Sequence, residues 1–372
     1  MASTIDLPSF KGRPGWEFTD ISKLDLAAYE RALPERDGGY EPLWDLETPE
    51  LPAGVIVGDL ADPEQLGSLV SGRDDVFVAL NDAAERGGTF VYVPRGVVVE
   101  QPISLATVQA HTGTLVNQRT LIVLEEDAQA EVWEQYLSGS EDLDGVVNVV
   151  TELIVGDGAR LRYVCGQGLS ERSWIFGAQR ASVGRSGSLD WVALGFGSAG
   201  GHVRMETRLA GEGADARVTG AYATRGRQHI DFDTTQEHAA PHTTSDLAFR
   251  GVLQGRSSAV WKGNIIVDPG AQKTDAFQES RNLLISKRAH ADAIPGLEIQ
   301  ANDVRCTHAA AVAQVDPEQL FYLRSRGLRE DVAKQLVIEG FLSALVERFE
   351  AGAVREVLGE ALERRLALVL AG

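Results

Sequence analysis

The sequence contains only two cysteines, Cys165 and Cys306, among 372 residues. Two are too few for a disulfide framework, which indicates a reducing compartment. The chain also lacks an apolar stretch of the ~20 residues that a spanning helix needs. Its first residues show no basic segment followed by an apolar run, as a secretory signal would. We therefore predict a cytoplasmic protein that does not span a membrane.

Basic residues are also scarce relative to acidic ones. The chain has 35 Lys and Arg against 54 Asp and Glu, which gives a formal net charge of −19. Such a surface repels phosphate backbones and anionic lipid, so neither nucleic acid nor a membrane is an expected partner. The composition is otherwise that of a globular protein, and its length predicts two or three structural units.

Prolines interrupt residues 1–88 repeatedly, so this first unit is predicted to be helical or irregular. Within it, residues 74–86 are expected to form a helix that Gly87-Gly88 ends. The chain would thus begin with a region that differs in structure from the residues after position 88.

Residues 89–315 are predicted to form a β core. Over 203–209 the chain alternates between apolar or hydroxyl side chains and charged ones, the period of a strand with one buried face. The same alternation places Leu161, Tyr163 and Cys165 on one face, so Cys165 is interpreted as structural and inert. More than 200 residues of strand favour a right-handed parallel β-helix, a β-solenoid, over a simple sandwich. No exact repeat period is visible.

Residues 316–372 are predicted to form a C-terminal helical domain. Asp316 and Pro317 supply an N-cap and a first-turn proline, and this helix would end at Gly327. Two more helices are expected over 330–350 and 354–370. Their apolar faces would comprise Val332, Leu336, Phe341, Leu345 and Phe349 in the former, and Val354, Leu358, Leu362 and Leu366 in the latter.

Two glycine-containing segments resemble nucleotide-binding motifs. Gly195–Gly200 matches G-x-G-x-x-G, but a predicted strand comes directly after it, so no helix N-terminus would hold a pyrophosphate. Gly270–Thr274 resembles the end of a phosphate-binding loop without the full pattern. Both are interpreted as turns. If ATP matters to this protein, another chain must hydrolyse it.

His229, Asp231 and Asp233 would share one strand face. Paired carboxylates can serve as the acid and base of glycoside cleavage, so a β-helical carbohydrate-active enzyme using Asp231 and Asp233 is an alternative function. The only adjacent aromatic residue, Phe232, would point to the opposite face. A solvated strand face is the simpler interpretation.

His238 and His242 lie four residues apart, which in a helix would suit a zinc ion. Pro241 disfavours a helix here, and the hydroxyl residues after His242 are typical of a turn. A metal site at this pair is therefore disfavoured.

The segment Asn302–His308 places a cysteine two residues before a histidine, in a predicted strand. Val304, Cys306 and His308 would point to one face, with Cys306 and His308 roughly 6–7 Å apart along the strand. That spacing suits two groups offered to a shared metal, sulfide or partner. In the alternative interpretation, Cys306 is a small buried apolar residue and His308 a local cap.

Several stretches together resemble the SufB/SufD family of iron–sulfur cluster assembly proteins. They are Asn282–Ser286 with Ala289–Ile299, Asp303–His308, Leu320–Leu328, the upstream segments His238–Ser245, Gly251–Leu253 and Gly263–Val267, and Trp16–Asp20 near the N-terminus. Within the family the chain is more similar to SufD than to SufB, because Ala289 stands where SufB members carry a cysteine. It departs from the family at Ala309-Ala310-Ala311, where Gly-Ala-Thr is usual.

The resemblance implies a scaffold subunit rather than an enzyme. It implies pairing with a SufB-like chain through the β core, or a homodimer when SufB is absent. It also implies docking of a SufC-like ATPase on the C-terminal domain, with Phe321, Tyr322, Arg324, Arg326 and Gly327 as the candidate region. His308 first and Cys306 second are the candidate ligands of iron or of a transient cluster at the SufB junction, and no stably bound cofactor is expected.

Overall fold

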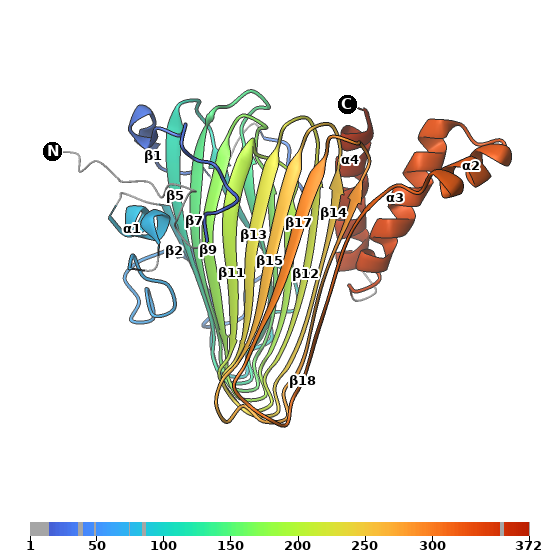
Figure 1. Cartoon of the computed structure of the whole chain (residues 1–372). Helices are drawn as coiled ribbons and strands as arrows, with labels where there is room; N and C mark the ends of the chain where they lie inside the picture. The colour runs from blue at the N-terminus through green and yellow to red at the C-terminus, as the bar shows by residue number, and fades with distance from the viewer. Residues whose placement is uncertain are drawn as a thin grey trace.

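The protein's structure, a computed structural model, describes residues 15–35, 40–47, 50–73, 75–83, 87–349 and 353–371. Its centre is a parallel β-solenoid in which the chain passes alternately through two sheets (Figure 1). Within the described residues, one sheet has ten strands and the other has eight. The predicted β-solenoid is confirmed.

The ten-stranded sheet contains, in spatial order, β17 (His290–Ile299), β15 (Ser258–Val267), β13 (His229–His238), β11 (Gly200–Leu209), β9 (Trp174–Val183), β7 (Gly145–Val155), β5 (Thr114–Leu124), β3 (Gly87–Val93) and β2 (Ile56–Asp59), with β1 (Glu30–Ala32) beside β5. The eight-stranded sheet contains β18 (Arg305–Gln314), β16 (Asp275–Leu284), β14 (Thr244–Leu253), β12 (Asp215–Thr224), β10 (Ser188–Gly195), β8 (Arg160–Gly168), β6 (Gln129–Ser138) and β4 (Ile103–Gln109). Only the β2–β3 pair is antiparallel among these described strands.

The length of one coil varies along the solenoid. Trp174 and its register partner Gly200 lie 26 residues apart in the sequence, whereas Ser258 and its partner His290 lie 32 apart. The strands keep nearly constant length while the turns change. This variation explains why the sequence shows no exact repeat.

Apolar side chains from both sheets fill the space inside the coils. Leu161, Tyr163 and Cys165 belong to one buried cluster, as the alternation predicts. The indole of Trp191 donates a hydrogen bond to the Cys165 sulfur at 3.5 Å. Burial raises the pKa of the Cys165 thiol to about 12. At neutral pH this cysteine is therefore a protonated, structural residue.

Both glycine-containing motifs are turns. Strand β10 ends at Gly195 and β11 begins at Gly200, so no helix comes after the first motif. At Gly197 a Cβ atom would lie 2.1 Å from the carbonyl oxygen of Leu169, so the close approach of the two chain segments requires glycine there. The second motif connects β15 to β16, and Thr274 donates to the carbonyl of Ala271 at 2.9 Å.

The described part of residues 1–88 is mainly irregular, with one short 3-10 turn, the strands β1 and β2, and helix α1 (Val76–Ala83). This helix lies within the predicted range 74–86, of which residues 74 and 84–86 fall outside the described residues. Gly87 and Gly88 were expected to end it. They are the first residues of β3, so the helix has ended before them.

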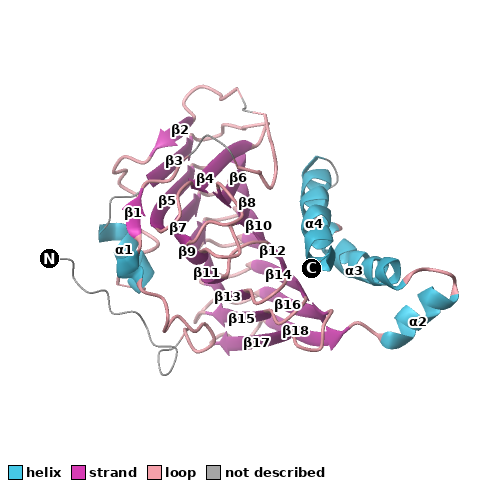
Figure 2. Cartoon of the chain, turned by 90° about the horizontal axis from the view of Figure 1, so that it is seen from above, coloured by secondary structure: helices cyan, strands magenta, loops and turns pink. Residues whose placement is uncertain are grey.

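Among the described residues, three helices come after the solenoid: α2 (Pro317–Ser325), α3 (Glu330–Val346) and α4 (Ala353–Ala371). The Asp316 carboxylate accepts a hydrogen bond from the Glu318 amide at 2.9 Å, which confirms the predicted N-cap. All residues of α2 are described and none is buried. Figures 1 and 2 show α2 projecting away from the solenoid, with α3 between it and α4.

The predicted apolar face of α3 is partly wrong. Val332 and Leu336 are 38% and 45% exposed. Leu345 and Phe349 are buried as predicted. Ala333, Ile338 and Leu342 are buried as well, and Ile338 and Leu342 pack against side chains from β12, β14 and β16. The predicted face of α4 is confirmed for Leu358, Leu362 and Leu366, which are buried. No helix of the described chain is long and apolar enough to cross a membrane.

Candidate functional site

Strands β17 and β18 form the last coil, and within the described part of the chain each pairs with a neighbour on one side only. Figure 2 shows them together at one end of the solenoid. Their outer edges present unpaired backbone N–H and C=O groups, and Ile299 and Val312 are each 43% exposed. An uncovered edge with apolar side chains is a ready template for another chain.

Cys306 lies near the start of β18, in register with Ala276 of β16. It packs with Val304 against a buried cluster that includes Ile265 and Ala276, so both residues point toward the interior of the coil. Burial, followed by the nearby Asp275 carboxylate, raises the pKa of the half-buried Cys306 thiol. The thiol is therefore mainly protonated at neutral pH in this state.

His308 is in register with Gln278 of β16. The side-chain amide of Gln278 donates to the backbone carbonyls of Gly263 and Gly296 at 3.2 and 3.1 Å. The Gln278 side chain therefore lies between the two sheets. Side chains in register on parallel strands share a face, which places His308 on the same inward face as Cys306. His308 is exposed, because no further coil of the described chain covers it. Ala310 is the next residue on that face and adds no polar group.

The structure thus places Cys306 and His308 on the same strand face at the open end of the solenoid. We call this end, formed by β17 and β18, the mouth. Among the described residues, no group of three or more His, Cys, Asp or Glu side chains is suited to hold a metal ion. Any metal bound at this mouth would need further ligands from elsewhere.

The strand face around Asp231 is closed rather than solvated, contrary to the simpler interpretation. Asp231 is 3% exposed, accepts a hydrogen bond from the Thr19 hydroxyl at 2.6 Å and pairs with His202 at 3.0 Å. Burial alone would raise the pKa of Asp231, but His202 and Thr19 hold it below its ordinary value. Asp233 pairs with Lys262 at 3.3 Å. A buried, paired carboxylate cannot meet a polysaccharide, so the carbohydrate-active alternative is not favoured.

The described segment that covers this face includes Trp16 and Thr19. The Trp16 ring lies 5.4 Å from Phe77 and 4.6 Å from His202, measured between ring centroids. The Thr19 hydroxyl also lies 3.1 Å from the His229 ring. Only the match of Trp16–Asp20 to the family indicated that this segment matters, and its partners His202 and His229 lie about 200 residues away in the sequence.

His238 and His242 do not come together. His238 is fully buried, and its two ring nitrogens lie 2.8 Å from the Thr243 hydroxyl and 2.9 Å from the Ser245 hydroxyl. Burial lowers the pKa of His238 to about 4. His242 is exposed in the adjoining turn. His238 is thus a neutral core residue.

This depressed pKa predicts a loss of stability in acid. The unfolded chain binds a proton at His238 below about pH 6.5, whereas the folded chain does not until about pH 4. The free energy of unfolding should therefore fall by up to about 3 kcal/mol across that interval through this residue. Urea unfolding of the wild type and of His238→Gln as a function of pH measures the effect. The dependence of the free energy of unfolding on pH should be weaker in the variant than in the wild type between about pH 4 and 6.5. An equal dependence on pH in both proteins would contradict the role given to His238.

The candidate docking residues gather where α2 meets α3. Phe321 and Tyr322 are 74% and 56% exposed, and the Arg326 guanidinium lies 5.3 Å from the Tyr322 ring centroid. An open hollow of about 1100 Å³ is lined by Phe321, Arg324 and Gly327 together with the first residues of α3. Exposed aromatic and arginine side chains are typical of the energetic centre of an interface.

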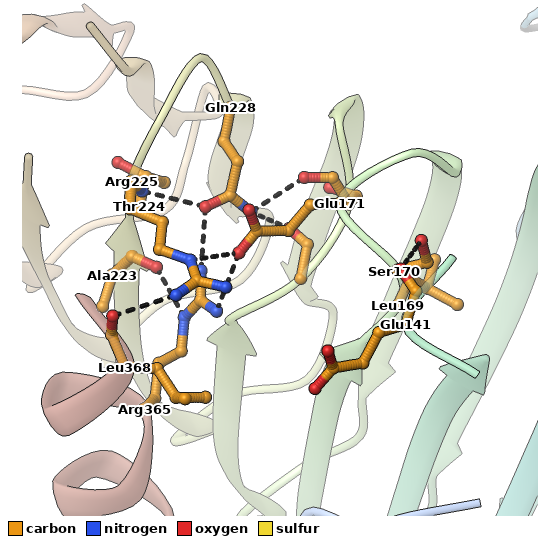
Figure 3. Close-up of polar contacts among 12 residues, drawn as sticks. Glu141, Leu169, Ser170, Glu171, Ala223, Thr224, Arg225, Gln228, Arg365 and Leu368 are labelled. Carbon is orange, nitrogen blue, oxygen red and sulfur yellow. Dashed lines mark hydrogen bonds and ion pairs between the residues drawn. The ribbon is translucent and has the colours of Figure 1, made fainter. Parts of the chain in front are cut away.

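A polar cluster that sequence reasoning missed joins α4 to the solenoid (Figure 3). The Arg365 guanidinium donates to the Ala223 carbonyl at 2.9 Å and to the Gln228 side chain at 2.8 Å. It also lies 3.4 Å from the Glu171 carboxylate, which accepts from Arg225 at 2.7 Å. Burial lowers the pKa of Arg365 to about 10, so it stays charged at neutral pH. The helix is thereby fixed to turns that connect the eight-stranded sheet to the ten-stranded sheet.

The structure defines the class of this protein: it is a parallel β-solenoid with an unpaired terminal coil and an appended helical region. A family model for the SufBD core domain of SUF system FeS cluster assembly matches residues 106–341. The chain is 34% identical to the iron–sulfur cluster assembly protein SufD of Bacillus subtilis, over 77% of this chain and 66% of that protein. It therefore spans slightly less than two thirds of that relative.

Two further relatives are also named as iron–sulfur cluster assembly proteins. A SufBD family protein of Mycobacterium tuberculosis is 32% identical over 75% of this chain and 71% of its own length. SufB of Bacillus subtilis is 28% identical over 75% of this chain and 60% of that protein. This chain belongs to the SufBD family of iron–sulfur cluster assembly proteins.

Proposed function

We propose that this chain is the SufD-like subunit of a scaffold that builds iron–sulfur clusters. It pairs with a SufB-like chain through its terminal coil and docks a SufC-like ATPase on its helical region. Cys306 and His308 assist cluster formation or iron entry at the junction. The observation that carries the proposal is the position of these two soft ligands on the inward face of a coil that no further described strand covers.

The two ligands suit iron in different degrees. Imidazole and thiolate are both good ligands for iron and for iron–sulfur clusters. The Cys306 thiol has a raised pKa, so iron must displace its proton on binding, which weakens the interaction at neutral pH. Imidazole binds in its neutral form, and His308 is exposed. His308 is therefore the stronger candidate, and the cluster is cargo that leaves rather than a resident cofactor.

The incomplete ligand set is consistent with a junction. Two ligands from this chain cannot fill the coordination of an iron ion or a cluster iron, which generally has at least four ligands. A second solenoid stacked on β17 and β18 would satisfy the free strand edges, bury the exposed apolar residues and face the two ligands from the other side. The site would then be closed by both subunits.

The helical region can couple an ATPase to this scaffold. Neither glycine-containing motif of this chain provides a phosphate-binding loop, so the ATPase is proposed to be a separate chain. Docking at Phe321 and Tyr322 would act on α3 and α4, and the buried Arg365 links α4 to the turns of the solenoid. Movement of the docked ATPase would thus reach the coils through packed helices and charged hydrogen bonds.

Replacing His308 by alanine tests the proposal. The SufBCD-type complex containing His308→Ala should bind at least about tenfold less iron and sulfide during reconstitution, since a ligand is removed. Cys306→Ser should have a smaller effect. Iron and sulfide content per complex, with subunit ratios from the same sample, measures the change.

Thr307→Ala is the matched control, because Thr307 neighbours both candidates but points to the other face. The complex that contains Thr307→Ala should take up as much iron and sulfide as the wild-type complex. Normal assembly with full loading in both His308→Ala and Cys306→Ser would instead mean that this chain is a purely structural partner.

A further inference from the structure

Three arginines stack in register at one corner of the solenoid. The pairing of His229 with Ser258, and of Ser258 with His290, places Arg227, Arg256 and Arg288 on successive coils, each two residues before the strand. All three are exposed, and so is Lys287 beside them. They lie in the turns that lead from the eight-stranded to the ten-stranded sheet. We call Arg227, Arg256 and Arg288 the arginine ladder.

The ladder carries uncompensated positive charge. No described carboxylate forms an ion pair with any of its three arginines or with Lys287, although many other arginines of the core do form such pairs. Like charges on neighbouring coils, about 4.8 Å apart, repel each other. This repulsion is notable in a chain with a net charge of −19.

The charge of this corner changes along the solenoid. The equivalent turn between β6 and β7 carries Glu141, Asp142 and Asp144, whereas the last three such turns carry the ladder. The basic side chains surround an open hollow of about 1220 Å³ that Gly226, Gly255 and Ser286 help to line. Gly226 and Gly255 have positive φ angles of 60° and 74°, a backbone conformation that glycine adopts readily. The corner therefore combines a concave shape with one sign of charge.

We propose that the arginine ladder is a docking surface for an acidic α-helix of a partner protein. The three rungs lie at about 0, 4.8 and 9.6 Å along the solenoid axis. Carboxylates at positions i, i+3 and i+7 of a helix lie at about 0, 4.5 and 10.5 Å along its axis and share one face. One such helix, lying along the solenoid axis, brings a carboxylate to every arginine.

Other acidic ligands fit the spacing less well. In an extended strand, side chains on one face are about 6.7 Å apart, whereas neighbouring arginines of the ladder are about 4.8 Å apart. The second and third acidic side chains of a strand would therefore not lie opposite the arginines. A pyrophosphate group is too short to reach three rungs. Duplex nucleic acid would bring its phosphates against the strongly acidic remainder of the surface. The ladder is independent of Cys306 and His308, so a failure of the cluster-ligand proposal would leave it intact.

A labelled helical peptide provides the test on the full chain. The probe is an alanine- and glutamine-based peptide of about 18 residues with glutamates at i, i+3, i+7 and i+10. Fluorescence anisotropy at low salt measures its affinity. Replacing all three rungs, Arg227→Gln, Arg256→Gln and Arg288→Gln, should weaken binding about tenfold or more.

The control variant makes the same change in net charge elsewhere. It combines Lys23→Gln, Arg95→Gln and Arg160→Gln, three exposed basic residues outside the ladder, and should change the affinity by less than about twofold. A peptide with the same glutamates scattered around the helix should bind more weakly than the probe.

Three outcomes would overturn the proposal. The first is an equal loss in the ladder and control variants. The second is equal binding of the scattered peptide, which would show attraction by net charge alone. The third is displacement of the probe by inorganic pyrophosphate, or by a short DNA duplex, at lower concentration than the unlabelled probe itself, which would identify a phosphate site.

Discussion

Ile299→Asp and Val312→Asp are each expected to abolish association with a SufB-like chain while leaving the solenoid folded. Both side chains are 43% exposed on the last coil, so a carboxylate there stays hydrated in the free protein. A stacked partner would bury it without a counter-charge, at a cost of several kcal/mol. The affinity should therefore fall by about 100-fold or more. Isothermal titration with the purified partner measures this fall.

Val98→Asp is the control for these variants. Val98 is 47% exposed and lies in the first coils of the solenoid, far along the stack from β18. It should leave association unchanged. If the two variants at the last coil bind as the wild type does, the partner does not stack on β17 and β18.

Phe321→Ala is expected to prevent docking of a SufC-like ATPase. Phe321 is 74% exposed and lines the hollow between α2 and α3, so truncating it removes contact area without leaving a cavity in the core. An aromatic anchor at the centre of an interface contributes about 2 kcal/mol or more, so affinity should fall by about 30-fold. Co-purification and titration of the ATPase measure the loss.

The control for docking is Leu33→Ala, a truncation at a 54% exposed residue of the N-terminal region. Both variants should keep the wild-type melting temperature. Full ATPase binding by Phe321→Ala would place the docking surface elsewhere on the chain.

The strand pattern and the helix starts could be predicted from the sequence because they depend on local chemistry. Alternation placed Tyr163 and Cys165 in the core, and Asp316 with Pro317 marked the start of α2. The coil length could not be predicted, because turns of different length change it from 26 to 32 residues without altering the strands.

Features set by distant contacts could not be predicted. The sequence pattern assigns Asp231 to a solvated face, because nothing nearby in the sequence shows that Trp16 and Thr19 cover it. The buried face of α3 depends on which side meets the sheet, and helical spacing alone assigned Val332 and Leu336 to it incorrectly.

The candidate site was predictable only in part. The sequence indicated that Cys306 and His308 share a strand face, and Cys306 packs with Val304 as that alternation requires. That the strand is the last of its sheet depends on the stacking of all earlier coils. The exposed mouth, which gives the pair its proposed role, therefore emerged only from the fold.

Hydrogen exchange of residues 305–314 tests the central claim, that the last coil is the junction with a second solenoid. In the free chain, the amides of β18 that point away from β16 should exchange rapidly, because they lie on an open edge. Adding the SufB-like partner should slow those amides strongly and leave strands in the middle of the stack unchanged. A complex that forms with no change in exchange across residues 305–314 would contradict the account.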